Sequence, residues 1–148
     1  VGWTQPKLRK LIKTEELMAV VAGKNAIDVG IVVNDITASV HFYCDIIGLE
    51  TVQEMPLWIG TMHRLAFGDS FVKLVDPKDN PPKTTKGLAS SLGIRYLTLQ
   101  VSNLDEICEI CKSNQVPFEL EKTELGPGVS IAMVHDPDGN TVEFVQRD

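Results

Sequence analysis

The sequence predicts an α+β fold in which two βαβββ modules form a cup-shaped, curved mixed sheet, preceded by an N-terminal helical extension. The first observation is a repeat, because residues 26–35 and residues 95–103 each read as a strand that leads into a helix. The second is that both copies continue with three more strands and end in similar sequences, residues 68–75 and 138–145. A duplicated unit of this length predicts two half-sheets, since a solenoid needs three or more short repeats. Two curved half-sheets that share a seam would enclose a ligand.

Length and composition limit the classes of function. The 148 residues fit one compact domain, and 43 % apolar with 23 % charged residues is typical of a globular protein. A net charge of −6 argues against a nucleic-acid-binding surface. No apolar run approaches the roughly 20 residues that span a bilayer. Three cysteines, an odd and low count, together with a start that shows no charged-then-apolar leader, predict a cytoplasmic protein without a disulfide framework.

The N-terminal segment precedes the repeat. Residues 4–22 are predicted to form a helix, with Pro6 in its first turn and a broken apolar stripe that packs on the domain or on a second copy. Residues 26–148 are predicted to form one domain. The full division is a helical extension at 1–25, a first module at 26–75, a linker at 76–92 and a second module at 93–148.

In the first module, apolar residues alternate from Ile27 to Val33 and predict a strand with one helix-facing side. A helix is predicted from about Ile36 to Gly48, because glycine is common just beyond the last helical residue. Three strands are predicted to follow, near residues 50–55, 59–67 and 71–75.

The linker is rich in proline and charge, which is typical of a surface segment. In the second module, the stripe Leu104, Ile107, Cys108 and Cys111 predicts an amphipathic helix. The two cysteines form a C-x-x-C pattern, but they lie in the middle of the helix on its apolar side. A redox pair normally sits at a helix N-terminus, so we interpret these cysteines as structural.

Two sequence motifs within the predicted fold resemble the motifs of a known protein family. Residues 42–50, Phe-Tyr-Cys-Asp-Ile-Ile-Gly-Leu-Glu, look like the pattern FYxxxLGxE, and residues 136–144, Asp-Pro-Asp-Gly-Asn-Thr-Val-Glu-Phe, look like DPDGNxxEx. In this order, over about residues 26–147, they resemble the vicinal oxygen chelate superfamily. That group includes glyoxalases, bleomycin-resistance proteins, extradiol dioxygenases, fosfomycin-resistance enzymes and methylmalonyl-CoA epimerases. The resemblance implies a cup-shaped small-molecule site and, for a chain of this length, a homodimer.

The resemblance also implies four positions at which metal-dependent members hold an ion. They fall here on Asp28, Lys73, Tyr96 and Glu143, each of which breaks the apolar side of its strand. Tyr96 is a poor ligand for a divalent ion, and the Lys73 ammonium has no lone pair. We therefore expect no metal cofactor and a cup in which Lys73 pairs with Glu143 or Asp28. The alternative is a weak or displaced divalent site made by Asp28, Glu143 and His63.

Four further residues are candidates for ligand binding. Thr98 and Gln100 face the same way as Tyr96 and would supply neutral hydrogen-bonding groups. His63 lies on a strand whose facing the sequence does not decide, so it is a candidate ligand or general base. Trp58, together with Tyr96, is a candidate aromatic wall of a groove.

Two functions remain open at this point. The first is a glyoxalase-like lyase or isomerase that acts on a small oxygenated metabolite, with Lys73 stabilising negative charge and Glu143 as the general base. The second is a metal-free small-molecule or drug-binding protein of the bleomycin-resistance type. Both expect a small-molecule ligand and a homodimer, and neither expects nucleic acid or a membrane.

Overall fold

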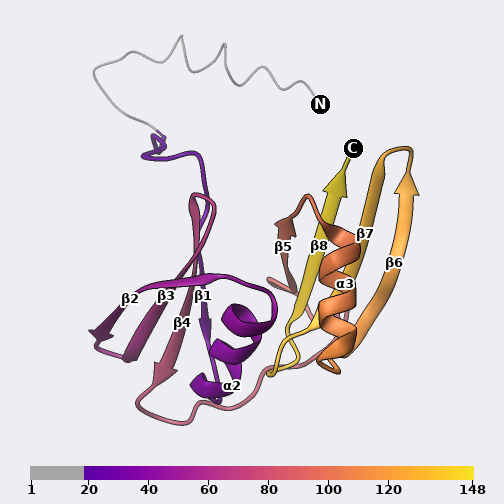
Figure 1. The fold of residues 1–148 in the computed structure, drawn as a ribbon. Coiled ribbons are helices and arrows are strands. Elements are labelled where there is room, and N and C mark those ends of the chain that lie inside the picture. The colour runs from indigo at the N-terminus through magenta and orange to yellow at the C-terminus, as the bar shows by residue number, and fades with distance from the viewer. Residues whose placement is uncertain (1–18) are drawn as a thin grey trace.

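The computed structural model describes residues 19–148, so most of the predicted helical extension lies outside the described residues. The described chain contains two four-stranded mixed sheets (Figure 1). In the first sheet the strands are β1 (Val29–Val32), β2 (Glu50–Leu57), β3 (Gly60–Phe67) and β4 (Ser70–Pro77). In the second sheet they are β5 (Tyr96–Gln100), β6 (Phe118–Gly126), β7 (Val129–His135) and β8 (Thr141–Arg147).

Both sheets have the same topology, which confirms the predicted βαβββ fold. The orders are β1-β4-β3-β2 and β5-β8-β7-β6, with the first strand of each module parallel to its last and the other pairs antiparallel. The registers also correspond, because Gly30 pairs with Lys73 in the first sheet and Thr98 pairs with Glu143 in the second. Lys73 and Glu143 therefore occupy equivalent places in the two modules.

The helical segment of the first module differs from a regular α-helix. It begins as α2 (Ile36–Val40), where the Asp35 side chain caps the N-terminus by accepting a hydrogen bond from the Ala38 N–H at 3.1 Å. It continues as the π-helix η1 (His41–Ile46), whose wider turn is marked by the bond from Ile47 N–H to the Phe42 carbonyl. Gly48 then ends the segment with φ +88°, at the position predicted.

The second module contains the helix α3 (Leu104–Ser113), and its predicted apolar stripe is buried as expected. Cys108 and Cys111 lie within that stripe as free thiols. Burial raises the pKa of both, that of Cys111 to about 11. A thiol that stays protonated at neutral pH is a poor nucleophile, so these cysteines act as core residues.

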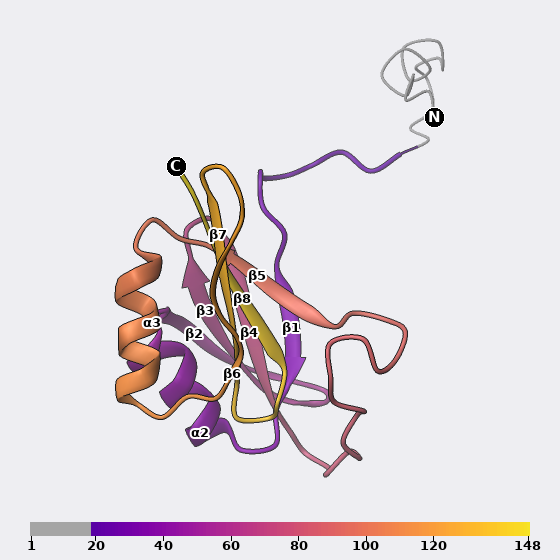
Figure 2. The ribbon, with the colours of Figure 1, turned by 90° about the vertical axis from the view of Figure 1, so that its right-hand side faces the viewer.

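The core lies between the two sheets. Figure 2 shows α2 and α3 together on one side of the strands, within the angle that the two sheets make in Figure 1. One apolar cluster joins residues of both helices to residues of both sheets, among them Tyr43, Leu74, Leu104 and Phe144. Each sheet thus has a helix-covered face, which looks toward the core, and an open face, which looks outward. Among the described helices, none has the length and apolar character that a membrane crossing requires.

Candidate functional site

The open face of the first sheet carries the residues that alternate with its core positions. Val72 and Leu74 are buried on the helix-covered face, so Phe71 and Lys73 lie on the open face. The antiparallel register places Arg64 directly opposite Lys73, and paired residues share a face. This face therefore holds two neighbouring cations from β3 and β4.

Asp28 precedes β1 and is fully engaged by its neighbours. Its Oδ1 accepts hydrogen bonds from Lys24 Nζ and from the Phe71 N–H, both at 2.8 Å. Lys24 Nζ also donates to the Asp69 carbonyl at 2.9 Å. The Lys24 ammonium, followed by the Phe71 N–H, holds the pKa of Asp28 below its usual range. Asp28 thus fixes Lys24 and the start of β4.

The expected pairing of Lys73 with Asp28 or Glu143 is found only in a weaker form, because the charge of Lys73 helps to lower the pKa of Asp28 after the larger effects of Lys24 and the Phe71 N–H. Within residues 19–148 Lys73 forms no ion pair, and the carboxylate of Asp28 pairs with Lys24 instead. Lys24 lies four residues before Asp28 in a segment without periodicity, so no alternation pattern pointed to it.

Phe71 connects the cations of this face. Lys24 Nζ lies 4.4 Å from the centre of its ring, and Arg64 Cζ lies 5.2 Å from it. Both distances are within the range of cation–π attraction. Arg64 was not among the residues singled out from the sequence. The pairing of β3 with β4 would have identified it, once the facing of β3 was known.

The open face of the second sheet carries polar side chains on β5 and a carboxylate on β8. Thr98 Oγ1 donates a 2.7 Å hydrogen bond to Glu143 Oε1, its partner across the parallel pair of β5 and β8. Tyr96 and Gln100 occupy the alternate positions of β5 on the same side, and Tyr96 is half exposed. The hydrogen bond orients the Glu143 carboxylate on this face.

Two of the predicted candidates lie elsewhere. His63 pairs with the core residue Leu74, so it lies on the helix-covered face, where Nδ1 is 3.5 Å from Glu54 Oε2. Trp58 lies in the turn between β2 and β3 and is 81 % exposed. That turn is at the far end of the sheet from Asp28, since β3 begins opposite the last residue of β4. Neither residue lies with Phe71 and Lys73 on the open face of the first sheet.

A cleft of about 220 Å³ lies where the two modules meet. We call it the seam cleft. It brings Phe71 of the first module close to Thr98 and Gln100 of the second. Its walls include Ile27, Phe67, Phe71, Leu97, Thr98 and Gln100. The cleft therefore has apolar walls and a polar edge contributed by β5.

The residues at the four resemblance-derived positions do not fit a divalent metal ion. Lys73 is in the first sheet and Asp28 lies just before β1 of that sheet, whereas Tyr96 and Glu143 are in the second sheet. Each pair is on an outward-looking face. The Asp28 carboxylate already accepts two donors, and the Lys73 ammonium offers no lone pair. In the described part of the chain, no three His, Cys, Asp or Glu side chains are grouped as a metal site would require.

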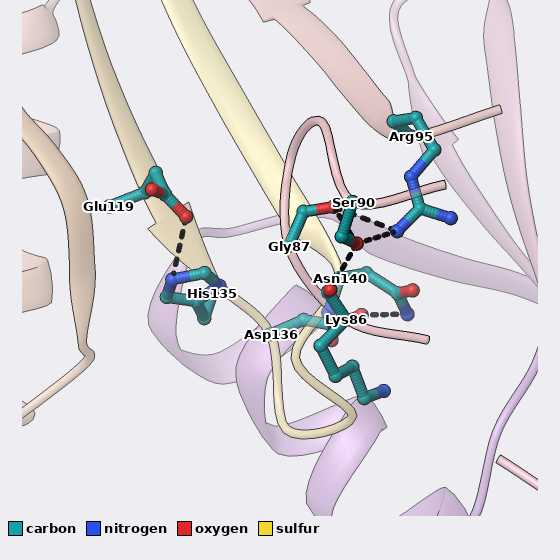
Figure 3. Close-up of polar contacts among 8 residues, drawn as sticks. All are labelled: Lys86, Gly87, Ser90, Arg95, Glu119, His135, Asp136 and Asn140. Atoms are coloured by element: carbon teal, nitrogen blue, oxygen red, sulfur yellow. Dashed lines mark hydrogen bonds and ion pairs between the residues drawn. The ribbon is translucent and has the colours of Figure 1, made fainter. Parts of the chain in front are cut away.

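A separate polar cluster secures the linker (Figure 3). Arg95 Nη2 donates to the Gly87 carbonyl at 2.7 Å and to Ser90 Oγ at 3.3 Å. Nearby, His135 Nε2 lies 3.2 Å from Glu119 Oε1 at the end of β7. The Arg95 bonds hold together the segment before β5, and the His135–Glu119 contact joins β7 to β6. We interpret both sets of contacts as structural.

Comparisons with known proteins agree with this architecture. The model of the Glyoxalase/Bleomycin resistance protein/Dioxygenase superfamily matches residues 26–144. Among solved structures, the antibiotic binding protein TnmS3 from Streptomyces sp. CB03234 has a TM-score of 0.66 and 23 % identity, with 87 % of this chain and 100 % of that chain covered. No curated protein sequence matches the chain.

Two further solved structures are similar. A glyoxalase/bleomycin resistance protein from Streptomyces sp. CB03234 has a TM-score of 0.61 and 25 % identity, covering 82 % of this chain and 98 % of that one. A lactoylglutathione lyase from Agrobacterium tumefaciens has a TM-score of 0.60 and 21 % identity, covering 81 % and 91 %. Since the family model spans most of the sequence and the fold agrees, this chain belongs to the glyoxalase/bleomycin resistance protein/dioxygenase superfamily.

Proposed function

We propose that this chain binds a small oxygenated molecule without a metal ion. The observation that carries the proposal is the seam cleft, in which apolar walls from both modules lie beside the polar side chains of Thr98 and Gln100. Ligand pockets in proteins commonly combine apolar walls with a few placed polar groups. The apolar part of the ligand occupies the cleft, and its oxygens reach the side chains at the edge.

The binding residues have distinct roles in this proposal. Thr98, Gln100 and Tyr96 form hydrogen bonds with the ligand along β5, while Lys73 contacts it from the first module. Asp28 acts indirectly, because its carboxylate is used to hold Lys24 and the Phe71 N–H. His63 and Trp58 are outside this proposed site, since they lie on the helix-covered face and at the far turn.

We also propose that the binding unit is a homodimer. The open faces look outward, and large apolar side chains near them are exposed: Val32 by 50 %, Tyr96 by 51 % and Ile94 by 90 %. A second copy that covers these side chains would enclose the ligand between two open faces. Light scattering coupled to size exclusion tests this, because Ile94→Glu should shift a dimer toward monomer. A wild-type monomer at high micromolar concentration would contradict it.

One observation favours a second candidate, a lyase or isomerase. The bond from Thr98 to Glu143 orients a carboxylate that could act as general base, while Lys73 stabilises negative charge on the substrate. Turnover of lactoylglutathione by metal-stripped protein would support this candidate. It should disappear in Glu143→Gln and fall in Thr98→Val, whose carboxylate has lost its orienting hydrogen bond.

The binding proposal is tested on protein treated with EDTA. We expect a fluorescent probe with an aromatic ring system and one sulfonate, anilinonaphthalene sulfonate, to bind with one site per chain. It should be displaced by ligands from a panel of small oxygenated aromatics. Gln100→Ala and Thr98→Val should weaken the ligands that displace it by about tenfold, the effect of a lost hydrogen bond that leaves a partner unpaired. The control is Thr123→Val, which removes a hydroxyl from β6 of the same sheet. Binding that needs an added divalent ion would contradict the proposal.

A further inference from the structure

Arg64 and Lys73 form a like-charge pair on the open face of the first sheet. They are direct partners across the antiparallel strands β3 and β4. Like charges directly opposite each other destabilise a sheet. Within residues 19–148 neither side chain forms an ion pair, although the whole chain has a net charge of −6. Among the described residues, the two cations are thus held together without a carboxylate in an ion pair that would balance them.

The surroundings of Arg64 add a second observation. Its Nε is buried and has no hydrogen-bond partner in the part of the chain that the structure describes. A buried N–H without an acceptor costs free energy, and an acceptor that reached it would recover that cost. The neighbouring residue on β2 is Gln53, which is neutral, and Arg64 Cζ lies 5.2 Å from the Phe71 ring centre. The guanidinium is positioned by packing and has no anionic partner among residues 19–148.

Acidic groups on the same face do not fill this role. Asp28 is held by Lys24 and the Phe71 N–H through one oxygen. Glu50 lies opposite Ala66, two positions along β3 from Arg64, and makes no ion pair within the described chain. Lys24 and Arg64 therefore lie against the Phe71 ring and Lys73 lies opposite Arg64. Of the two carboxylates, only that of Asp28 forms an ion pair within the described chain.

We propose that Arg64 and Lys73 form the binding site for a small oxyanion, a carboxylate or a phosphate-type group, carried by the ligand. An oxyanion between them neutralises the like-charge pair and supplies the acceptor that Arg64 lacks, since guanidinium and ammonium are strong partners of both groups. Phe71 connects this site to the seam cleft, because it lines the cleft and also contacts Arg64. The inference rests on the proposed small-molecule binding and names its ligand class as anionic.

Thermal unfolding and calorimetry of EDTA-treated protein test the inference. The probes are benzoate and phenyl phosphate, with neutral benzamide as the matched comparison and sodium chloride at equal ionic strength as the baseline. We expect both anions to raise the unfolding temperature above the chloride baseline and benzamide to leave it unchanged. The difference between benzoate and phenyl phosphate tells which oxyanion the site prefers.

Substitutions then give a readout that an ordinary structural role would not produce. Arg64→Gln and Lys73→Gln should each weaken benzoate or phenyl phosphate by about tenfold or more. In buffer without these anions, each should also raise the unfolding temperature, because the like-charge repulsion is removed. The control is Lys83→Gln, an exposed lysine of the linker, which should change neither quantity.

Three results would overturn the inference. The first is an unfolding temperature that responds to benzoate and phenyl phosphate no more than to chloride. The second is anion binding that survives both Arg64→Gln and Lys73→Gln. The third is tight binding of benzamide equal to that of benzoate, which would leave the proposed binding function intact. Anion binding that requires added Mn²⁺ but still depends on Arg64 and Lys73 would instead contradict the metal-free proposal alone.

Discussion

The Tyr43 hydroxyl donates a 2.7 Å hydrogen bond to Oδ2 of Asp136 across the junction of the two modules. Tyr43 is fully buried, and Asp136 is 4 % exposed. The Asp136 carboxylate also accepts the N–H groups of Asp138 and Asn140 and the Asn140 side-chain amide. Tyr43 belongs to the first family motif and Asp136 to the second. The two motifs are thus in contact and dock the first module on the last turn of the second.

The first prediction concerns this hydrogen bond. Tyr43→Phe keeps the ring in the core but leaves one oxygen of a buried carboxylate short of a donor. We expect the free energy of unfolding in urea to fall by about 1–2 kcal/mol. Tyr96→Phe is the control, since Tyr96 is half exposed and should change stability by less than about 0.5 kcal/mol. Equal effects of the two substitutions would contradict the assigned role of Tyr43.

The second prediction is the pH dependence of the same contact. Burial, followed by the neighbouring Asp136 carboxylate, raises the pKa of Tyr43 well above its ordinary value of 10.0. The stability from this shift is fully present below the unfolded-state pKa of Tyr43, and it is lost as the pH rises toward the folded-state pKa. The stability advantage of the wild type over Tyr43→Phe should therefore shrink above about pH 10. An advantage that grows with alkaline pH would be inconsistent with this sign.

The fold could be predicted because its signals are local and repeated. Alternation around Val29, the glycine at 48 and the stripe that ends at Cys111 each specify one element, and the duplication specifies how the elements combine. The positions of Lys73 and Glu143 follow from that duplication, and the strand registers place them equivalently. Periodicity carries this information because side chains alternate faces in a strand.

The partners of the site residues could not be predicted in the same way. The facing of His63 depends on the register of an irregular strand pair, where β2 has a bulge between Thr51 and Gln53, and a shift of one residue exchanges the two faces of a strand. Lys24 comes from a segment without a repeat. Whether the four resemblance-derived positions lie close together depends on how the two sheets are oriented. The residue pattern of a single strand carries no information about that orientation.

The third prediction concerns the close approach of β3 to the end of β4. Gly60 has φ +155°, and a Cβ built there would lie 2.0 Å from the Asp76 carbonyl oxygen. Backbone atoms cannot move aside as a flexible side chain can. Gly60→Ala should lower the free energy of unfolding by about 1–3 kcal/mol, as expected for an overpacked site. Gly30→Ala is the matched control in β1, because nothing lies within 4 Å of its Cβ position.

The fourth prediction concerns the reactivity of the thiols. Cys111 is fully buried, and burial raises its pKa to about 11, while Cys44 is only partly buried. Since the thiolate is the reactive form, an aromatic disulfide reagent at pH 8 should modify Cys44 first. Cys108 and Cys111 should react only at the rate of unfolding, and all three should react at once in concentrated denaturant. Rapid modification of Cys111 in the native protein would contradict its placement in the core.

The last prediction concerns Lys24, which holds the open face of the first sheet in place. The Lys24 ammonium is the largest cause of the lowered pKa of Asp28, followed by the Phe71 N–H. Lys24→Gln removes the charge, so the pKa of Asp28 measured by NMR titration should rise toward its ordinary value of 3.8. Because the folded-state pKa is lowered, the stabilising effect is present above the unfolded pKa and is lost as the pH falls through the folded value.

The control for this titration is Lys122→Gln, which breaks an ion pair with Asp105 on the second module. It removes the same charge from the chain, so any general effect of net charge on the pKa of Asp28 appears in both variants. Only Lys24→Gln should shift the pKa of Asp28, because Lys24 Nζ lies 2.8 Å from Asp28 Oδ1 whereas Lys122 pairs with Asp105. If Asp28 titrates identically in both variants, the Phe71 N–H dominates its environment. Lys24 would then be free to contact an anionic ligand together with Arg64 and Lys73.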